Sequence, residues 1–297
     1  MAALLGIFPA GASAASIILE GNYMRTAVDD YGTLGAGGGT SPGLLHDSTG
    51  TGTFGAEDWI TPGLPWAGWS VACGQIADVY NNNDTDSAQN AISGTVSTYA
   101  GLIGGETYDN AVEWTGANGT YSVTEYYYFN DDDQLIHIDM TVTALTDLTN
   151  VQVAHYFDPD PGGNPTTENV RGSVANGLAT TDWVQATATV SGNVMGMYSV
   201  SEITHNAAIV DPWDQGPATF LASGTDSLTA DALIGIGFDV GTLNNGESAT
   251  IGLVYAAVAD IADLDIGGPG QWIGGTDTLW STTENWDPNT PRPTGRR

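Results

Sequence analysis

Apolar and polar residues alternate most clearly between residues 121 and 157. In the segment Leu135–Ala144 the even-numbered positions are apolar, and the odd-numbered positions after Leu135 are polar. Successive side chains of a strand point to opposite faces, so this pattern predicts a half-buried strand. Tyr121–Phe129 is rich in aromatic and β-branched residues, as strands are, and Val151–Phe157 alternates again. Short turn clusters separate the three segments, which predicts an antiparallel three-stranded meander.

The same signals recur along the rest of the chain. Glycine, asparagine and aspartate mark turns between apolar runs, as at Gly241–Gly246. Helical spacing is confined to Cys73–Tyr80 and Ser87–Ile92. Further strands are predicted at residues 17–28, 183–191, 194–200, 232–240 and 248–259. The fold class predicted from this pattern is all-β, an antiparallel multi-strand β-sandwich with few or no helices.

The two ends of the chain differ from its middle. Residues 1–15 are apolar and then small, and Ala12-Ser13-Ala14 has the form of a signal-peptidase site, although the usual basic start is missing. An ordinary apolar N-terminus is the alternative. Residues 16–266 are predicted to form one β-sandwich domain. Residues 267–297 are predicted to be a linker and the start of a truncated repeat region, because Trp272, Trp280 and Trp286 recur among Gly, Thr and Asn there.

Charge limits the kinds of partner. The chain has 35 acidic and 5 basic residues, a formal net charge of -30, and no lysine. Phosphate backbones and anionic lipids are bound through lysine and arginine, so nucleic acid and polybasic membrane binding are excluded as functions. A single cysteine, Cys73, rules out an internal disulfide and a cysteine-built zinc site. Together with the signal-like start, this composition predicts a secreted or cell-surface bacterial protein, or else a salt-adapted protein whose acids are simply solvated.

Clustered acidic turns point to a possible cofactor. Calcium prefers six to eight oxygen ligands, which carboxylates on loops supply. None of the acidic turns has the EF-hand spacing, and aspartate is also a common turn former in its own right. The residues predicted to bind a structural Ca²⁺ are Asp131, Asp132 and Asp133, Asp158 and Asp160, and Asp84 and Asp86.

Signals for catalysis are weak. No nucleophile motif or phosphate-binding loop is present, and His155 shares a strand face with apolar residues, which favours a hydrogen-bonded core histidine. A pair of Asp or Glu residues, as glycoside hydrolases use, stays open. Sugar rings would stack on Trp59, Trp66 and Trp69. The substrate would be a neutral glycan, because the middle of the chain has almost no basic residues to neutralise a uronate.

Three motifs carry a resemblance to a known class of proteins. They are the F-N-D-D-D turn between two strands, the strand that ends in F-D-P-D-P, and the G-x-L-x-x-G-E-S hairpin at 241–248. Together these segments resemble the N-terminal β-sandwich domain of large secreted, autotransporter-type bacterial surface proteins. The spacing of tryptophans in residues 271–293 is similar to that of the segment that opens the β-solenoid repeats of these proteins. The resemblance implies an extracellular sandwich attached to a surface array and transfers no catalytic residue.

Two functions from different classes follow. The first is a non-enzymatic exported adhesion or structural module, stabilised by Ca²⁺, whose partner is a glycan or another surface protein. The alternative is a secreted carbohydrate-active enzyme or carbohydrate-binding protein that acts on neutral glycans. A concave aromatic groove with acidic residues would favour the alternative, whereas a packed sandwich with flat outer faces would favour the first.

Overall fold

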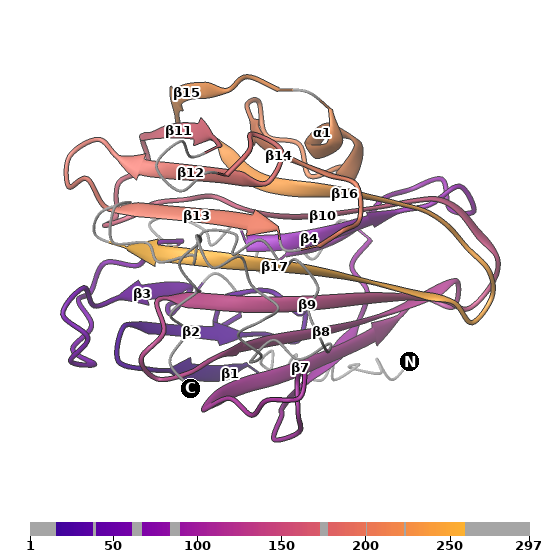
Figure 1. The fold of residues 1–297 in the computed structure, drawn as a ribbon, viewed down its shortest axis with the longest axis horizontal. Helices are drawn as coiled ribbons and strands as arrows, with labels where there is room; N and C mark the ends of the chain where they lie inside the picture. Colours follow the sequence, from indigo (N-terminus) through magenta and orange to yellow (C-terminus); the bar gives the residue numbers. More distant parts are fainter. Residues whose placement is uncertain are drawn as a thin grey trace, which may run out of the picture.

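The chain folds into antiparallel sheets with almost no helix, which confirms the predicted all-β fold class (Figure 1). The computed structural model describes residues 16–37, 40–60, 67–83, 90–172, 178–199, 201–222 and 224–258. Within these ranges no helix is long and apolar enough to cross a membrane.

Three sheets make up the described fold. The small sheet has the order β1 (Ile17–Glu20), β2 (Met24–Val28), β3 (Leu44–His46). The five-stranded sheet has the order β14 (His205–Val210), β16 (Leu233–Leu243), β10 (Leu148–Phe157), β4 (Ala67–Ala72), β5 (Tyr80–Asn83). The nine-stranded sheet has the order β15 (Ser227–Ala230), β11 (Thr167–Arg171), β12 (Trp183–Ala188), β13 (Val194–Ser199), β17 (Ser248–Val258), β9 (Leu135–Ala144), β8 (Tyr121–Phe129), β7 (Asn110–Ala117), β6 (Gly94–Thr98).

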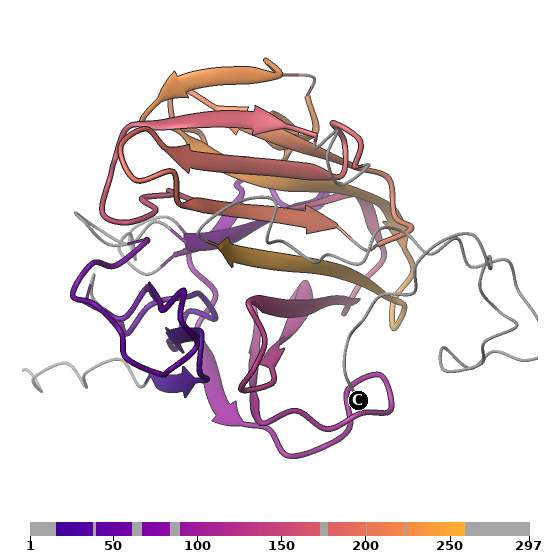
Figure 2. The same cartoon turned by 60° about the vertical axis from the view of Figure 1, so that its left-hand side comes forward.

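The core lies between the nine-stranded and five-stranded sheets. Figure 1 looks onto the nine-stranded sheet, with β16, β10 and β4 behind it, and Figure 2 shows the two layers from the side. Alternation builds this core: Ile138 and Met140 of β9 are fully buried in the same cluster as Val153 and Phe157 of β10. The polar residues between them on β9 point to the other face of the sheet.

The predicted three-stranded meander is wrong in its third strand. Strand β8 pairs with β9 as expected, but β10 pairs with β16 and β4, and the second neighbour of β9 is β17. The chain crosses from one sheet to the other after β9. Residues 153–157 of β10 are buried without alternation, because both faces of that strand are covered.

Two further local predictions need correction. The strand predicted at 17–28 is a hairpin of β1 and β2, since Gly21 turns the chain and its N–H bonds to the Met24 carbonyl at 2.9 Å. The helix predicted at Cys73–Tyr80 is a turn that leads into β5. Of the helix predicted at Ser87–Ile92, residues 87–89 lie outside the described residues, and residues 90–92 are not helical. The one helix among the described residues is α1 (Pro217–Leu221), which the pattern did not predict.

Candidate functional site

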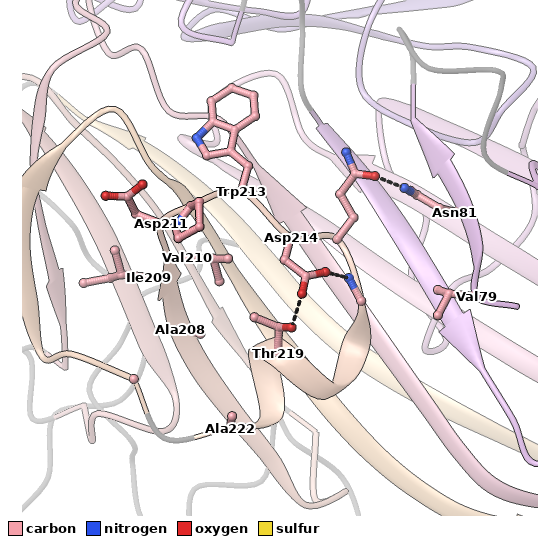
Figure 3. A pocket seen from close by; sticks show the side chains of 14 residues that line it. Val79, Asn81, Ala208, Ile209, Val210, Asp211, Trp213, Asp214, Thr219 and Ala222 are labelled. Carbon is pink, nitrogen blue, oxygen red and sulfur yellow. Dashed lines mark hydrogen bonds between the residues drawn. The ribbon is translucent and has the colours of Figure 1, made fainter.

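An open groove of about 840 Å³ lies on the outer face of the five-stranded sheet, away from the core (Figure 3). Val79 and Asn81 line it beside β5, and the end of β14 lines it on the other side. The segment 211–216, which joins β14 to α1, forms its rim. Figure 3 shows Asp211, Trp213 and Asp214 along this segment. The arrangement is therefore a cleft with an aromatic and acidic rim.

The rim presents an aromatic ring to solvent. Trp213 is 37% exposed, and its indole Nε1 donates a hydrogen bond to the Asp231 carbonyl at 3.3 Å. Asp211 and Asp214 are exposed beside it. An indole face with neighbouring hydrogen-bond acceptors is a surface on which a sugar ring can stack while its hydroxyl groups donate to carboxylates.

Hydrogen bonds fix the rim in place. The Asp214 carboxylate accepts from the Gly216 N–H at 2.8 Å and from the Thr219 hydroxyl at 2.6 Å. The Gln215 carbonyl accepts from the Ser70 hydroxyl of β4 at 2.6 Å, and its side-chain oxygen accepts from the Asn81 amide of β5. The rim is thereby tied to the sheet beneath it, which lowers the entropy that ligand binding would cost.

Helix α1 holds the other end of the rim. Phe220 is fully buried and stacks on Tyr156 of β10, with ring centroids 5.5 Å apart and planes 13° apart. Glycines make room for it: a Cβ on Gly235 would lie 2.4 Å from the His155 carbonyl and 2.6 Å from the Phe220 ring. Glycine at this position of β16 therefore allows the helix to lie directly on the sheet.

The predicted calcium ligands fall in three places. Asp131, Asp132 and Asp133 form the β8–β9 turn, where Asn110 donates to Asp131 at 3.0 Å and Asn22 donates to Asp132 at 2.8 Å. Asp84 and Asp86 lie outside the described residues. Asp158 and Asp160 follow β10 and are buried, 7% and 2% exposed. No three Asp, Glu, His or Cys side chains of the described ranges are grouped so that they could hold a metal ion. The calcium hypothesis stays a prediction.

The predicted stacking tryptophans do not form one surface among the described residues. Trp69 is fully buried, donates to the Gly32 carbonyl at 3.0 Å, and meets Trp114 edge to face at 5.4 Å. Trp59 is 4% exposed and lies against His46 at 4.6 Å. Trp66 is outside the described residues. Their role in ligand stacking stays a prediction.

A buried polar pair crosses the core. His155 of β10 contacts Glu125 of β8 through Nε2 at 2.8 Å, and its Nδ1 lies 3.1 Å from the Tyr255 hydroxyl of β17. Burial raises the pKa of Glu125 well above its usual range, with a further contribution from Asp29, and burial lowers the pKa of His155 to about 3. Both groups are therefore neutral at pH 7, so Glu125 donates its proton to Nε2. This pair joins the two sheets and is not accessible to a ligand.

The outer face of the nine-stranded sheet pairs tyrosines with acids. Tyr126 donates to Glu113 at 2.6 Å, and Tyr128 donates to Asp139 at 3.2 Å. Tyr128 also stacks on His137, at 5.3 Å and 17°. Glu113 lies directly opposite Tyr126 in the register of β7 and β8, whereas Asp139 lies diagonally across β8 and β9 from Tyr128. Sequence alone did not show these pairs.

Comparisons with known proteins support the fold. No protein-family model matches the chain, and no curated protein sequence does. A bacterial glucoamylase solved in complex with acarbose is similar, with a TM-score of 0.56 and 9% identity, covering 85% of this chain and 33% of that one. The chain therefore spans about a third of the glucoamylase.

Two other solved structures are less similar. The galactosidase domain of an α-galactosidase–sucrose kinase has a TM-score of 0.46 and 9% identity, covering 82% of this chain and 40% of that one. A galactose mutarotase related enzyme from Lactobacillus acidophilus has a TM-score of 0.40 and 9% identity, covering 82% and 97%. At such identities the glucoamylase likeness shows the fold alone, and the weaker two carry no argument.

Proposed function

We propose that this chain is a carbohydrate-binding β-sandwich that holds a neutral glycan in the groove beside Trp213. The observation that carries the proposal is the exposed indole of Trp213 between Asp211 and Asp214, on a rim tied to the sheet by hydrogen bonds. The similarity of this fold to part of a glucoamylase, a carbohydrate-active enzyme, supports the proposal. This function corresponds to the second of the two that the sequence suggested.

The charge of the groove selects the class of glycan. Two aspartates stand on its rim, and the described residues that line it include no arginine or lysine. A uronate or sulfated sugar would be repelled by these carboxylates, whereas the hydroxyl groups of a neutral sugar can donate to them. The ligand is therefore a neutral oligosaccharide.

The groove supports binding in preference to hydrolysis. Glycoside hydrolases place two carboxyl groups on opposite sides of the scissile bond. Here Asp214 uses both of its oxygens to hold Gly216 and Thr219. Among the described residues that line the groove, Asp211 is the only other carboxylate. The proposed role is that of a binding domain within an exported carbohydrate-active protein. The adhesion role, the surface-array resemblance and the signal peptide stay predictions.

Replacing Trp213 by alanine is expected to weaken glycan binding at least about thirtyfold, because a buried aromatic anchor is commonly worth 2 kcal/mol or more. Isothermal titration calorimetry with malto-, cello-, xylo- and galacto-oligosaccharides would measure this. Trp213→Phe should recover part of the affinity, since a phenyl ring still stacks. The exposed Leu102→Ala variant serves as the control. Equal affinities for the wild type and Trp213→Ala, or no binding by the wild type to any of the four, would contradict the proposal.

A further inference from the structure

Two buried aspartates lie where the five-stranded sheet ends. Phe157, the last residue of β10, pairs with Ile234 of β16. Asp231, two residues before β16 begins, is close enough to interact electrostatically with the carboxylates of Asp158 and Asp160. The Asp160 N–H donates to the Trp59 carbonyl at 2.7 Å, which fixes the turn next to Asp58. Four carboxylates from three segments, those of Asp58, Asp158, Asp160 and Asp231, are thus brought to one end of the sheet.

One carboxylate oxygen of each buried aspartate is not satisfied by the described residues. The Oδ1 atoms of Asp158 and Asp160 have essentially no accessible surface and no hydrogen-bond partner among the described residues. Asp58 differs, because its oxygens accept from the Ser41 hydroxyl and from the N–H groups of Gly43 and Leu44. A buried carboxylate oxygen without a partner is costly. The charge on Asp158 and Asp160 therefore has to be neutralised, either by a cation or by protons.

Basic side chains of the described residues do not supply that charge. Arg25 pairs with Glu20 at 3.1 Å, and Arg171 pairs with Asp226 at 3.3 Å. Burial, together with neighbouring aspartates, raises the pKa of Asp158 to about 8 and that of Asp160 to about 7. Without a cation, these carboxylates would have to keep their protons at neutral pH, so a cation or protons must neutralise them.

We infer that Asp158 and Asp160 form a calcium site at the end of β10. Ca²⁺ is a hard cation that takes oxygen ligands and accepts irregular geometry, which suits two carboxylates that flank a proline. Since no third ligand-type side chain is grouped with them among the described residues, backbone carbonyls and water would complete the coordination. Asp231 and Asp58 add negative charge nearby. The site adjoins the Trp213 rim through Asp231, whose carbonyl accepts from the Trp213 indole, but the inference does not depend on the proposed glycan binding.

The test is thermal unfolding at pH 7.5, with EDTA, with Ca²⁺ and with Mg²⁺ at equal ionic strength. At a Ca²⁺ concentration a hundredfold above Kd, the Tm of the wild type is expected to rise by about 5–10 °C. The Asp158→Asn/Asp160→Asn variant should show no such rise. Its Tm in EDTA should equal or exceed that of the wild type, because two uncompensated buried acids have been removed. Asp131→Asn/Asp132→Asn, altered at an exposed acidic turn, is the control and should keep the full response.

Each of the following outcomes would overturn the inference. An equal rise with Mg²⁺ would show general screening of the net charge of -30. A calcium response that survives in Asp158→Asn/Asp160→Asn, or that disappears in the Asp131/Asp132 control, would place the ion elsewhere. A wild-type Tm that falls with rising pH and does not change when Ca²⁺ is added would show that protons neutralise Asp158 and Asp160. Should the double variant not fold, Tb³⁺ luminescence excited through tryptophan, with Ca²⁺ as competitor, tests the wild type directly, and no sensitised emission would refute the site.

Discussion

Replacing Phe220 by alanine is expected to lower the free energy of unfolding by about 3–5 kcal/mol, the cost of removing a fully buried aromatic ring. Phe220 has no accessible surface and stacks on Tyr156, in a space that Gly235 and Gly237 leave open. Gly235 and Gly237 have no side chains that could move into the space left by the ring, so the cavity would persist. Urea unfolding, followed by tryptophan fluorescence, would measure the loss.

The same substitution is expected to affect the groove. Thr219, next to Phe220 on α1, holds the Asp214 carboxylate, so loosening the helix loosens the rim that carries Trp213. Glycan affinity should therefore fall together with stability. Val190→Ala, at a side chain that is 89% exposed, provides a control that removes apolar carbons without leaving a cavity. It should change the free energy of unfolding by no more than about 0.5 kcal/mol. A Phe220→Ala variant as stable as this control would contradict the predicted loss of stability, and unchanged glycan affinity would contradict the predicted loosening of the rim.

How far the fold follows from the sequence depends on whether the signal is local. Strands β8 and β9 follow from the sequence, because alternation and the Asn130–Asp133 turn lie within twenty-five residues of each other. The position of β10 does not follow, because the burial of one strand does not say which sheet it joins. Its partners, β16 and β4, lie about eighty residues away on either side. Local pattern predicts strands, whereas sheet order depends on pairing between distant segments.

The candidate groove shows the same limit. The sequence interpretation named Trp59 and Trp69 as stacking residues, and both are buried. It did not name Trp213, which is exposed. Residue type does not reveal exposure, because tryptophan fills cores as readily as it lines clefts. A usable signal was the segment Asp211-Pro212-Trp213-Asp214, which places an aromatic residue between acids and next to proline, a turn former. Asp158 and Asp160 were identifiable from sequence as acidic, but their burial was not.

The buried pair of Glu125 and His155 should make stability depend on pH in two opposite directions. Since the pKa of His155 is lowered to about 3 in the folded protein, the unfolded chain takes up a proton below pH 6.5 that the folded protein cannot. Stability therefore falls as pH drops from 6.5 towards 3, by as much as about 1.4 kcal/mol per pH unit. The pKa of Glu125 is raised well above 4.5, so stability also falls as pH rises above 4.5, because the unfolded chain then loses a proton that the folded protein keeps.

Two variants separate these effects. In Glu125→Gln the amide can still donate to His155 Nε2 and carries no titratable proton, so the variant should gain stability over the wild type as pH rises from 4.5 to 8. His155→Gln should lose the acid dependence between pH 6.5 and 3, since glutamine does not titrate. Asp158 and Asp160 also make stability fall as pH rises, because their pKa values are raised in the folded protein. This effect is the same in the wild type and in the variants, so it cancels in the difference between them. Urea midpoints measured across pH 4 to 8 give these differences. A constant offset between Glu125→Gln and the wild type at every pH would contradict the prediction, because it would mean that folding does not shift the pKa of Glu125.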